Sequence, residues 1–416
     1  MRALLLLALA SCTHDISVFD QADVQTARDL DILYVFDNSS DRGVYDQMAS
    51  QLDVLQTQLT AVDGQLPSLH VGVVTTDLGT RGRLDAIPAK SVGNCAGSGD
   101  AGKLMTFNAG LGFGNFLEDL RGPDGTRIRN YDDAELAPAL GRLTNPAPGT
   151  TKQGCDFPQP LEAMRLALDP KVNPDFIRPD AQLSIVFLTN QDDCSLAHGA
   201  MLDPTDPTFG APFEFRCTEQ GVVCDDDPAT PGTHTNCKPR DGSKYMIDVS
   251  DYQTFLTAVK PDPHDVMVSA VAGPRTPFQT EDIGVPVLLP SCSGKGGNAM
   301  PPVRIGALVD SFGGAMVNAC TQDAAYQQIT APMLGHERSC FANLRRTDGD
   351  NCTVTEVAGD TSTTIASCAD GNASPCWYTY DDATACPAGD HVGIAINRGA
   401  STAPAGAKIQ ATCFAK

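Results

Sequence analysis

Unbroken apolar segments alternate with amphipathic segments along most of the chain. The runs at 31–36, 69–74, 183–188 and 266–272 lack polar alternation, which favours strands buried on both faces of a parallel sheet. Between the first two runs, apolar residues recur at spacings of three and four over 44–62, as on one face of a helix. A strand, a helix and a second strand at this spacing predict a right-handed crossover unit.

The same alternation continues to residue 334. Further expected elements are helices at 133–143, 161–168, 252–259, 303–312 and 324–334, and a short edge strand at 316–317. This order of strands and helices predicts an α/β fold with a doubly wound, mostly parallel sheet. Segments 78–130 and 195–248 lack clear periodicity, and we expect them to be cysteine-bearing insertions in that fold.

The chain changes character near its C-terminal end. Six cysteines fall in the last 77 residues, where Thr, Ser, Gly and Val dominate and helical periodicity disappears. We therefore expect an α/β domain over 31–339 and a small, β-rich, disulfide-stapled extension over 340–416.

The N-terminal residues predict a secretory signal peptide over 1–11. A basic residue is followed by a leucine-rich run and a small-residue cleavage site. Leu-Ala-Ser-Cys at 9–12 resembles the lipobox of bacterial lipoproteins, which implies that Cys12 carries lipid and begins a tether over 12–30. Thr13 stands where an aspartate signals inner-membrane retention, so the resemblance implies the outer membrane. The alternative is an ordinary signal peptide that ends beside a cysteine.

Cysteine content and charge narrow the class of protein. Of 15 cysteines, 14 remain without Cys12, and none forms a Cys-x-x-Cys pair. Even parity after a secretion signal favours disulfides in an oxidising compartment, although their pairing stays open. The net charge of −22 disfavours nucleic acid and anionic lipid head groups as partners.

Side chains with hard oxygen atoms follow three of the predicted strands. In open α/β sheets, ligands bind beyond the carboxyl ends of the strands, and such oxygens suit Mg²⁺ or Ca²⁺. The candidate donors are Asp37, Ser39 and Asp41 after the first strand, Thr75, Thr76 and Asp77 after the second, and Asn190, Asp192 and Asp193 after the third. Asp37 could instead cap a helix, and the two adjacent aspartates could be solvated loop acids.

The segment 37–41, Asp-Asn-Ser-Ser-Asp, resembles the Asp-x-Ser-x-Ser motif of von Willebrand factor A-type (vWA) domains, with Asp41 in place of the last serine. Asn190, after Thr189, stands where the family has an aspartate. The resemblance implies a metal-ion-dependent adhesion site held by Asp37, Ser39, Asp41 and Asn190. The loop threonine of the family has no clear match, and Asp156 lies near its place.

The wider pattern, with Asp77 after the second strand and Asp-Asp-Cys at 192–194 after the third, resembles cysteine-rich bacterial outer-membrane lipoproteins with this fold. It implies a surface or periplasmic binding domain whose Mg²⁺ or Ca²⁺ accepts a carboxylate from an unknown protein ligand. The alternative is a structural envelope lipoprotein whose site is degenerate and metal-free. The sequence contains neither His-Glu-x-x-His nor Gly-x-Ser-x-Gly, and nothing pairs a nucleophile with a base, so we do not expect an enzyme.

Overall fold

The computed structural model divides the chain into two units. The larger comprises 26–334 and 399–401, and the smaller comprises 1–25, 335–398 and 402–416. The structure describes residues 17–23, 29–39, 52–60, 66–105, 114–122, 126–131, 136–144, 154–179, 181–209, 214–261, 263–295, 297–321, 325–334, 336–340, 352–359, 361–370, 375–381, 392–398, 404 and 407–414. Among them, no helix combines the length and the apolar character needed to cross a membrane.

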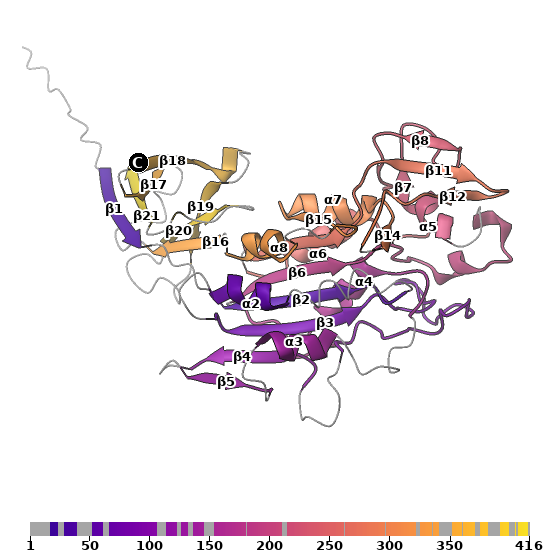
Figure 1. The fold of residues 1–416 in the computed structure, drawn as a ribbon, viewed down its shortest axis with the longest axis horizontal. Helices are drawn as coiled ribbons and strands as arrows, with labels where there is room; N and C mark the ends of the chain where they lie inside the picture. The colour runs from indigo at the N-terminus through magenta and orange to yellow at the C-terminus, as the bar shows by residue number, and fades with distance from the viewer. Residues whose placement is uncertain are drawn as a thin grey trace, which may run out of the picture. The chain divides into compact units, whose positions relative to one another are not determined.

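The larger unit is built on a seven-stranded sheet (Figure 1). Its order is β15-β10-β6-β2-β3-β4-β5, and the first five of these strands are parallel. The antiparallel pairs β3·β4 and β4·β5 complete one edge. The strands are β2 (Leu30–Phe36), β3 (Leu69–Thr75), β4 (Leu117–Arg121), β5 (Arg127–Arg129), β6 (Gln182–Leu188), β10 (Val266–Ala272) and β15 (Met316–Asn318).

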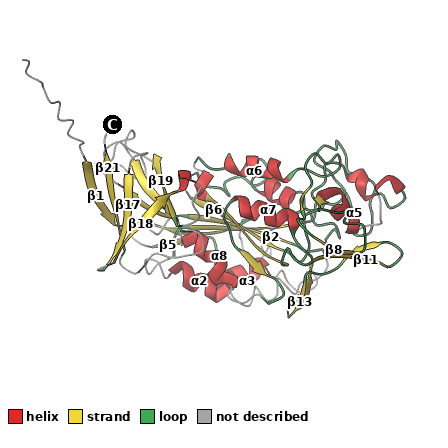
Figure 2. Cartoon of the chain, turned by 90° about the horizontal axis from the view of Figure 1, so that it is seen from above, coloured by secondary structure: helices red, strands yellow, loops and turns green. Residues whose placement is uncertain are grey.

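Helices cover both faces of this sheet, as Figure 2 shows from above. One face packs against α2 (Leu52–Thr60), α3 (Leu136–Thr144) and α8 (Ala325–Leu334). The other packs against α4 (Pro160–Ala167), α6 (Val249–Thr257) and α7 (Val303–Ser311). The predicted doubly wound α/β fold is confirmed.

The two helix layers explain why the strands read as unbroken apolar runs. Along β2, Ile32 and Tyr34 belong to the core under α2, α3 and α8, whereas Leu33 and Val35 belong to the core under α4, α6 and α7. Every residue of β2, β3, β6 and β10 is buried. Since both faces are covered, polar alternation would place polar groups in a core.

The predicted insertions contain short elements without a clear sequence signal. Besides β4 and β5, the longer connections hold the 3₁₀ turns η1 (Gly199–Leu202), η2 (Pro207–Phe209) and η3 (Pro263–Asp265), helix α5 (Glu214–Gly221), and strands β7 (Val222–Val223), β8 (Gly232–His234), β9 (Lys238–Pro239), β11 (Phe278–Asp282), β12 (Pro286–Leu288), β13 (Cys292–Gly294) and β14 (Gly297–Ala299). They pair as β12-β11-β8, β13-β14 and β7-β9.

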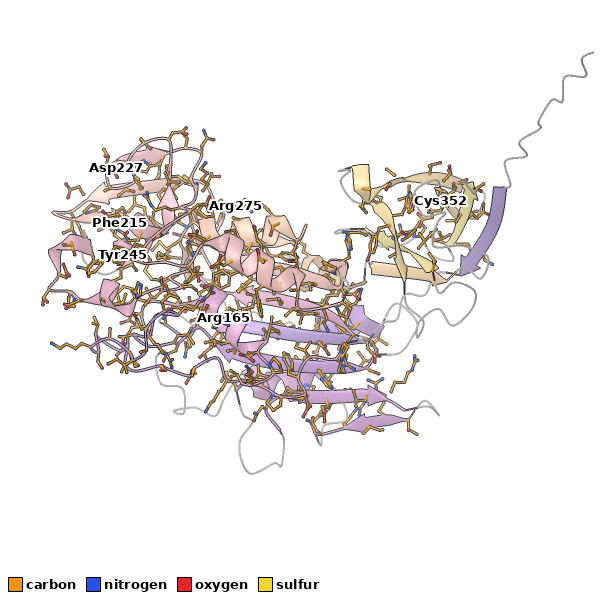
Figure 3. All side chains as sticks on the ribbon, turned by 180° about the vertical axis from the view of Figure 1, so that it is seen from behind. Arg165, Phe215, Asp227, Tyr245, Arg275 and Cys352 are labelled. Carbon is orange, nitrogen blue, oxygen red and sulfur yellow. A yellow bond between two sulfur atoms is a disulfide. The ribbon has the colours of Figure 1, made fainter. Side chains whose placement is uncertain are left out.

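Disulfides join these connections, as the cysteine count predicted. Five bridges lie wholly within the described part of the chain: Cys95–Cys155, Cys194–Cys217, Cys224–Cys237, Cys292–Cys320 and Cys368–Cys376. Cys352 in the smaller unit, labelled in Figure 3, is also a disulfide-bonded cysteine. The first two bridges belong to an apolar cluster with Phe157, Leu196 and Met246, so they reinforce a small core beside the main sheet.

The smaller unit is a β-sheet of order β1-β21-β17-β18-β19-β20-β16. Its elements are β1 (Ser17–Asp23), β16 (His336–Cys340), β17 (Cys352–Ala358), β18 (Thr361–Ser367), η4 (Cys368–Asp370), β19 (Cys376–Asp381), β20 (Val392–Asn397) and β21 (Lys408–Phe414). Val354, Trp377, Ile394 and Ile409 lie in its core. The β-rich extension is confirmed.

The structure differs from the expected tether at residues 17–23. Strand β1 pairs antiparallel with β21 over its whole length, from Ser17 opposite Phe414 to Asp23 opposite Lys408. An open strand edge offers unpaired backbone groups to any segment able to extend along it. Pairing therefore draws part of the polar N-terminal segment into the C-terminal sheet.

A buried charge cluster lies at the amino end of β2. The Asp31 carboxylate accepts hydrogen bonds from Arg178 Nε at 2.8 Å and from Lys260 Nζ at 3.1 Å. The side chains of Asp31 and Lys260 are fully buried. Burial lowers the pKa of Lys260, and the Asp31 charge opposes that shift. Asp31 is therefore the counter-charge for two cations at this edge of the sheet.

The buried His70 side chain makes the folded state less stable as the pH falls. Its Nδ1 donates to the Phe176 carbonyl at 2.8 Å, and burial lowers the His70 pKa from 6.5. Below pH 6.5 the unfolded chain takes up a proton that the folded chain resists, so the free energy of unfolding should fall as pH drops. His70→Asn keeps a donor and removes the titration, so it should lose less stability between about pH 7 and pH 5. Urea denaturation measures both proteins, and equal losses would contradict this assignment.

Candidate metal-binding site at the carboxyl edge of the sheet

The carboxyl ends of β2 and β6 form the switch point of the sheet. From β2 the chain proceeds to β3 on one side, and β6 then pairs with β2 on the other side. Asp37 directly follows β2, and its backbone N–H donates to the Leu188 carbonyl at 2.9 Å. Thr189 directly follows β6. In α/β sheets, the crevice at such a switch point is where ligands bind.

Side-chain hydrogen bonds bring the two loops together. Thr189 Oγ1 donates to Asp37 Oδ2 at 2.7 Å, and the Ser39 N–H donates to Asp37 Oδ1 at 2.9 Å. Gln191 Nε2 donates to Ser39 Oγ at 3.1 Å. Asp37 is 5% exposed and Ser39 is fully buried. Asp37 and Ser39 therefore lie at one edge of the sheet with the loop that carries Asn190.

Of the remaining two predicted ligands, one lies within the structure. Asn190 is half-buried, its backbone carbonyl accepts the Met300 N–H at 2.8 Å, and its side chain lines a cavity. Asp41 lies outside the described residues, as does Cys12. The coordination of a cation by Asp41 and Asn190 stays a prediction.

Asp192 accepts hydrogen bonds at the start of a helix. Its carboxylate accepts the N–H groups of Arg304 at 3.0 Å and Ile305 at 3.2 Å, in the first turn of α7. Burial raises the Asp192 pKa to about 6, although these N–H groups favour the charged form. A buried carboxylate at a helix N-terminus satisfies amide groups that otherwise lack partners. Asp192 therefore has a structural role that sequence reasoning did not assign.

Asp193 makes a similar contact with α4 and adds an ion pair. Its Oδ1 accepts the Leu161 N–H at 3.1 Å and the Ser195 hydroxyl at 2.5 Å. Its Oδ2 accepts Arg304 Nε at 3.0 Å, and both of these charged side chains are fully buried. The 189–195 loop thus holds the N-termini of α4 and α7 beside the candidate site.

Asp77 and Asp156 lie in neighbouring loops. Asp77 Oδ1 accepts the Gly79 N–H at 2.9 Å in a turn, and burial raises the Asp77 pKa. Asp156 accepts a long hydrogen bond from Asn94 Nδ2 at 3.4 Å and contributes to the cavity lined by Asn190. In these hydrogen bonds the partners of Asp77 and Asp156 are Gly79 and Asn94, not Asp37 or Ser39.

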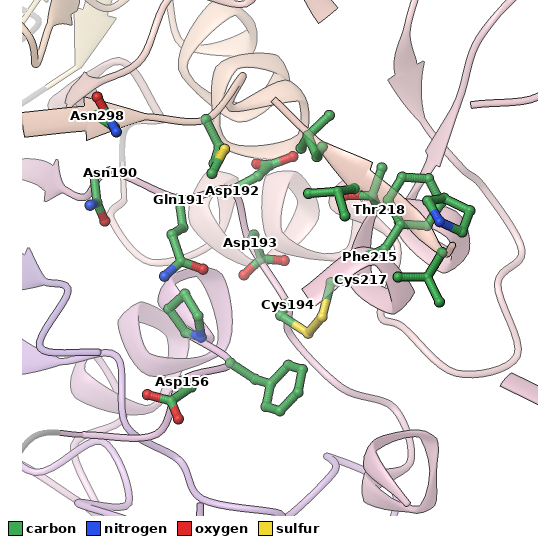
Figure 4. A pocket seen from close by; sticks show the side chains of 17 residues that line it. Asp156, Asn190, Gln191, Asp192, Asp193, Cys194, Phe215, Cys217, Thr218 and Asn298 are labelled. Atoms are coloured by element: carbon green, nitrogen blue, oxygen red, sulfur yellow. A yellow bond between two sulfur atoms is a disulfide. The ribbon is translucent and has the colours of Figure 1, made fainter. Parts of the chain in front are cut away.

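A cavity of about 400 Å³ lies beside the 189–193 loop (Figure 4). Its polar lining includes Asn190 and Gln191, and its apolar lining includes Phe215 and the β12 edge strand. The lining contains aspartates and no Lys, Arg or His. A ligand that fills it would make apolar contacts on one side and hydrogen bonds on the other.

Among the described residues, two buried oxygen atoms at this edge have no hydrogen-bond partner. One is Asn38 Oδ1, and the other is Thr76 Oγ1. The backbone of Gly154 packs against the Asn38 amide, because a Cβ atom at residue 154 would lie 2.4 Å from Asn38 Oδ1. Buried polar atoms are rarely left unpaired, and a bound cation would give both oxygens a partner.

The donor set is chemically suited to a hard cation. The recorded partners of the Asp37 carboxylate are neutral groups, and a carboxylate has more acceptor capacity than two hydrogen bonds use. No cluster of three or more His, Cys, Asp or Glu side chains suited to a metal occurs among the residues the structure covers. A cation here would need neutral oxygens from Ser, Thr or Asn, which Mg²⁺ and Ca²⁺ accept.

Sequence reasoning named Thr76 among the hard oxygen donors, but it gave no role at this edge to the side chains of Asn38, Thr189 and Gln191. Thr189 and Thr76 are each the first residue after a buried strand, as Asp37 is. A search for oxygen-bearing residues directly after every apolar run finds Thr189 as well as Thr76. Gln191 could not be found in this way, because its contact with Ser39 depends on how the loop turns.

Comparison with known proteins finds distant matches among solved structures. No protein-family model and no curated protein matches the sequence. Among solved structures, the pilus adhesin RrgA from Streptococcus pneumoniae matches with a TM-score of 0.33 and 11% identity, over 96% of this chain and 58% of that one. A von Willebrand factor type A protein from Catenulispora acidiphila matches with 0.32 and 10%, over 98% and 66%. The protein BatB from Bacteroides thetaiotaomicron matches with 0.28 and 11%, over 73% and 98%.

The chain thus spans less than two thirds of the length of the RrgA structure. The fold assignment rests on the chain itself, whose parallel sheet is covered by helices on both faces.

Proposed function

We propose that this protein is a vWA-like binding protein of the bacterial cell envelope that holds Mg²⁺ or Ca²⁺ at the carboxyl edge of its sheet. The observation that carries the proposal is the convergence of Asp37 and Ser39 with the 189–191 loop at the switch point. Asp37, Ser39, Asp41 and Asn190 would hold the cation. The proposed activity is binding, and no bond is made or broken.

The cation would supply a Lewis-acidic position that a partner's carboxylate completes. Asp37 provides the negative charge, and its hydrogen bonds to Ser39 N–H and Thr189 Oγ1 fix the orientation of the carboxylate. Gln191 Nε2 donates to Ser39 Oγ, which leaves the lone pairs of that oxygen partly free. The adjacent cavity would receive a neighbouring part of the same partner and add apolar contact area.

The location we propose follows from the chemistry of the chain. Disulfides in the described loops need an oxidising compartment, and lipidation at Cys12 would hold the protein at the outer membrane. The similarity to structures described as pilus adhesins agrees with a surface or periplasmic role. The partner we propose is a protein that offers a carboxylate, and the net charge of −22 disfavours nucleic acid as an alternative.

Calorimetric titration of the purified protein with Mg²⁺ and then Ca²⁺ tests the proposal. Wild type should bind at least one of these cations, and Asp37→Ala should weaken binding by at least about 100-fold, because even indirect partners of a metal contribute 10–100-fold. Asp37→Asn keeps the shape of the side chain and should show the same loss. Asp53→Ala removes an exposed carboxylate from α2 and serves as the matched control.

Absence of heat in wild type, or equal affinity in wild type and Asp37→Ala, would reject the metal site. The protein would then be the structural envelope lipoprotein that the sequence left as the alternative. Melting curves recorded without metal establish that each variant is folded before titration.

A further inference from the structure

The Thr76 hydroxyl makes no hydrogen bond with the part of the chain that the structure describes. Thr76 is fully buried, and among these residues its Oγ1 has no donor or acceptor as a partner. Other buried threonines nearby are satisfied: Thr80 Oγ1 donates to the Ala89 carbonyl at 2.7 Å, and Thr189 Oγ1 donates to Asp37. A buried hydroxyl without a partner costs free energy, so its presence calls for an explanation outside folding.

The sheet register places Thr76 beside Asp37. Phe36 lies opposite Thr75 across the β2·β3 pair, and the Thr76 N–H donates to the Phe36 carbonyl at 3.0 Å. Thr189 occupies the equivalent position on the other side, since Phe36 also lies opposite Leu188. Thr76, Asp37 and Thr189 therefore form one row across three neighbouring strands.

The three side chains of this row face the same side of the sheet. Val74, Val35 and Phe187 all belong to the core under α4, α6 and α7. Side chains two positions apart along a strand share a face, and continuing this alternation one residue past each strand end assigns Thr76, Asp37 and Thr189 to that side as well. Thr189 bonds to Asp37 from one side, and Thr76 presents an unused oxygen on the other.

We infer that Thr76 Oγ1 is a direct ligand of the cation bound at Asp37; this inference rests on the proposed function. The vWA-like site has a threonine in a loop, and this chain has no clear match for it near residue 156. Thr76 supplies a neutral hydroxyl oxygen in place of that threonine. Here that oxygen comes from the strand beside β2 instead of the loop before α4. Its lone pairs are free to accept a cation, because no donor occupies them.

Thr76→Val tests this role, since valine has the shape of threonine without the hydroxyl. The metal-free variant should melt higher than wild type by about 2–4 °C, because an unsatisfied buried group is removed. Its Mg²⁺ affinity, measured by calorimetry on the full chain, should fall by about tenfold or more. Thr76→Ser keeps the oxygen and should retain affinity within a few-fold.

Thr80→Val is the matched control. It also removes one buried threonine hydroxyl, but that hydroxyl donates to Ala89, so this variant should melt lower and bind Mg²⁺ as wild type does. The opposite signs of the two melting shifts separate a ligand oxygen from a structural one.

The outcomes also separate the two proposals. Mg²⁺ binding that Asp37→Asn abolishes and Thr76→Val leaves unchanged would overturn the role of Thr76 and keep the metal site. A wild-type protein that binds neither Mg²⁺ nor Ca²⁺ would overturn both. A tenfold loss confined to Thr76→Val, with Thr76→Ser and Thr80→Val unaffected, supports the assignment.

Discussion

Asp193→Ala should destabilise the larger unit by about 3–5 kcal/mol, because it leaves a buried charge without its partner. The Arg304 guanidinium is fully buried, and its Nε donates to Asp193 Oδ2 at 3.0 Å. The same substitution removes the acceptor for the Leu161 N–H at the start of α4. The free energy of unfolding, measured by urea denaturation, should show the loss without any added metal.

A double variant separates the ion pair from the rest of this effect. Arg304→Met combined with Asp193→Ala removes both charges and should recover part of the lost free energy, since a buried pair adds little over apolar side chains of similar size. If Asp193 were a metal ligand instead, Asp193→Ala would be near wild type in stability and would lose Mg²⁺ affinity. A loss below about 1 kcal/mol would contradict the structural role.

The main strands and helices could be predicted because their pattern is local. The segments 31–36, 69–74, 183–188 and 266–272 correspond to β2, β3, β6 and β10 to within one residue at each end. Burial on both faces leaves a continuous apolar run that few other structures produce. The helix predicted at 303–312 corresponds to α7. It could be predicted because one of its faces packs in the core and therefore carries regularly spaced apolar residues.

Other elements carry no such local signal. Strand β4 alternates buried with half-buried positions over only five residues, and β5 covers three. Their existence depends on pairing with β3 and with each other, which is a long-range contact. Strand β1 pairs with β21, almost 400 residues later in the chain, as in Ser17 opposite Phe414. Periodicity within a short window cannot report such partners.

In the candidate site too, residues with a local sequence signal could be predicted and those that depend on long-range contacts could not. Asp37 and Ser39 were predictable because they follow the strand directly and match a known motif. The contacts of Asp192 and Asp193 were not, because their partners Arg304 and Leu161 lie 112 and 32 residues away. The positions of the N-termini of α4 and α7 decide the role of each aspartate. An aspartate beside a helix N-terminus accepts its N–H groups, and another can face a ligand. Residue type alone does not distinguish these roles.

Asp31→Ala should destabilise the larger unit by about 3–5 kcal/mol as well, at the opposite edge of the sheet. The variant leaves Lys260, which is fully buried, without its counter-charge, and it removes the acceptor for Arg178 N and Nε. Differential scanning calorimetry and urea denaturation measure the loss. Asp29→Ala is the control, because Asp29 is 52% exposed and its pair with Arg178 at 3.4 Å should contribute less than about 1 kcal/mol.

The Asp31 variant also tests whether stability at the amino ends of the strands is independent of Mg²⁺ binding at their carboxyl ends. Asp31 lies at the start of β2 and Asp37 follows its end, so the folded fraction of Asp31→Ala should bind Mg²⁺ with wild-type affinity. If Lys260 loses its proton when Asp31 is removed, the loss of stability is limited but not abolished, because an amine with an ordinary pKa of 10.5 gives up its proton at neutral pH only at a cost in free energy. In that case the stability of Asp31→Ala would fall as the pH is lowered and the buried amine gains charge, whereas the Asp29→Ala variant would follow wild type.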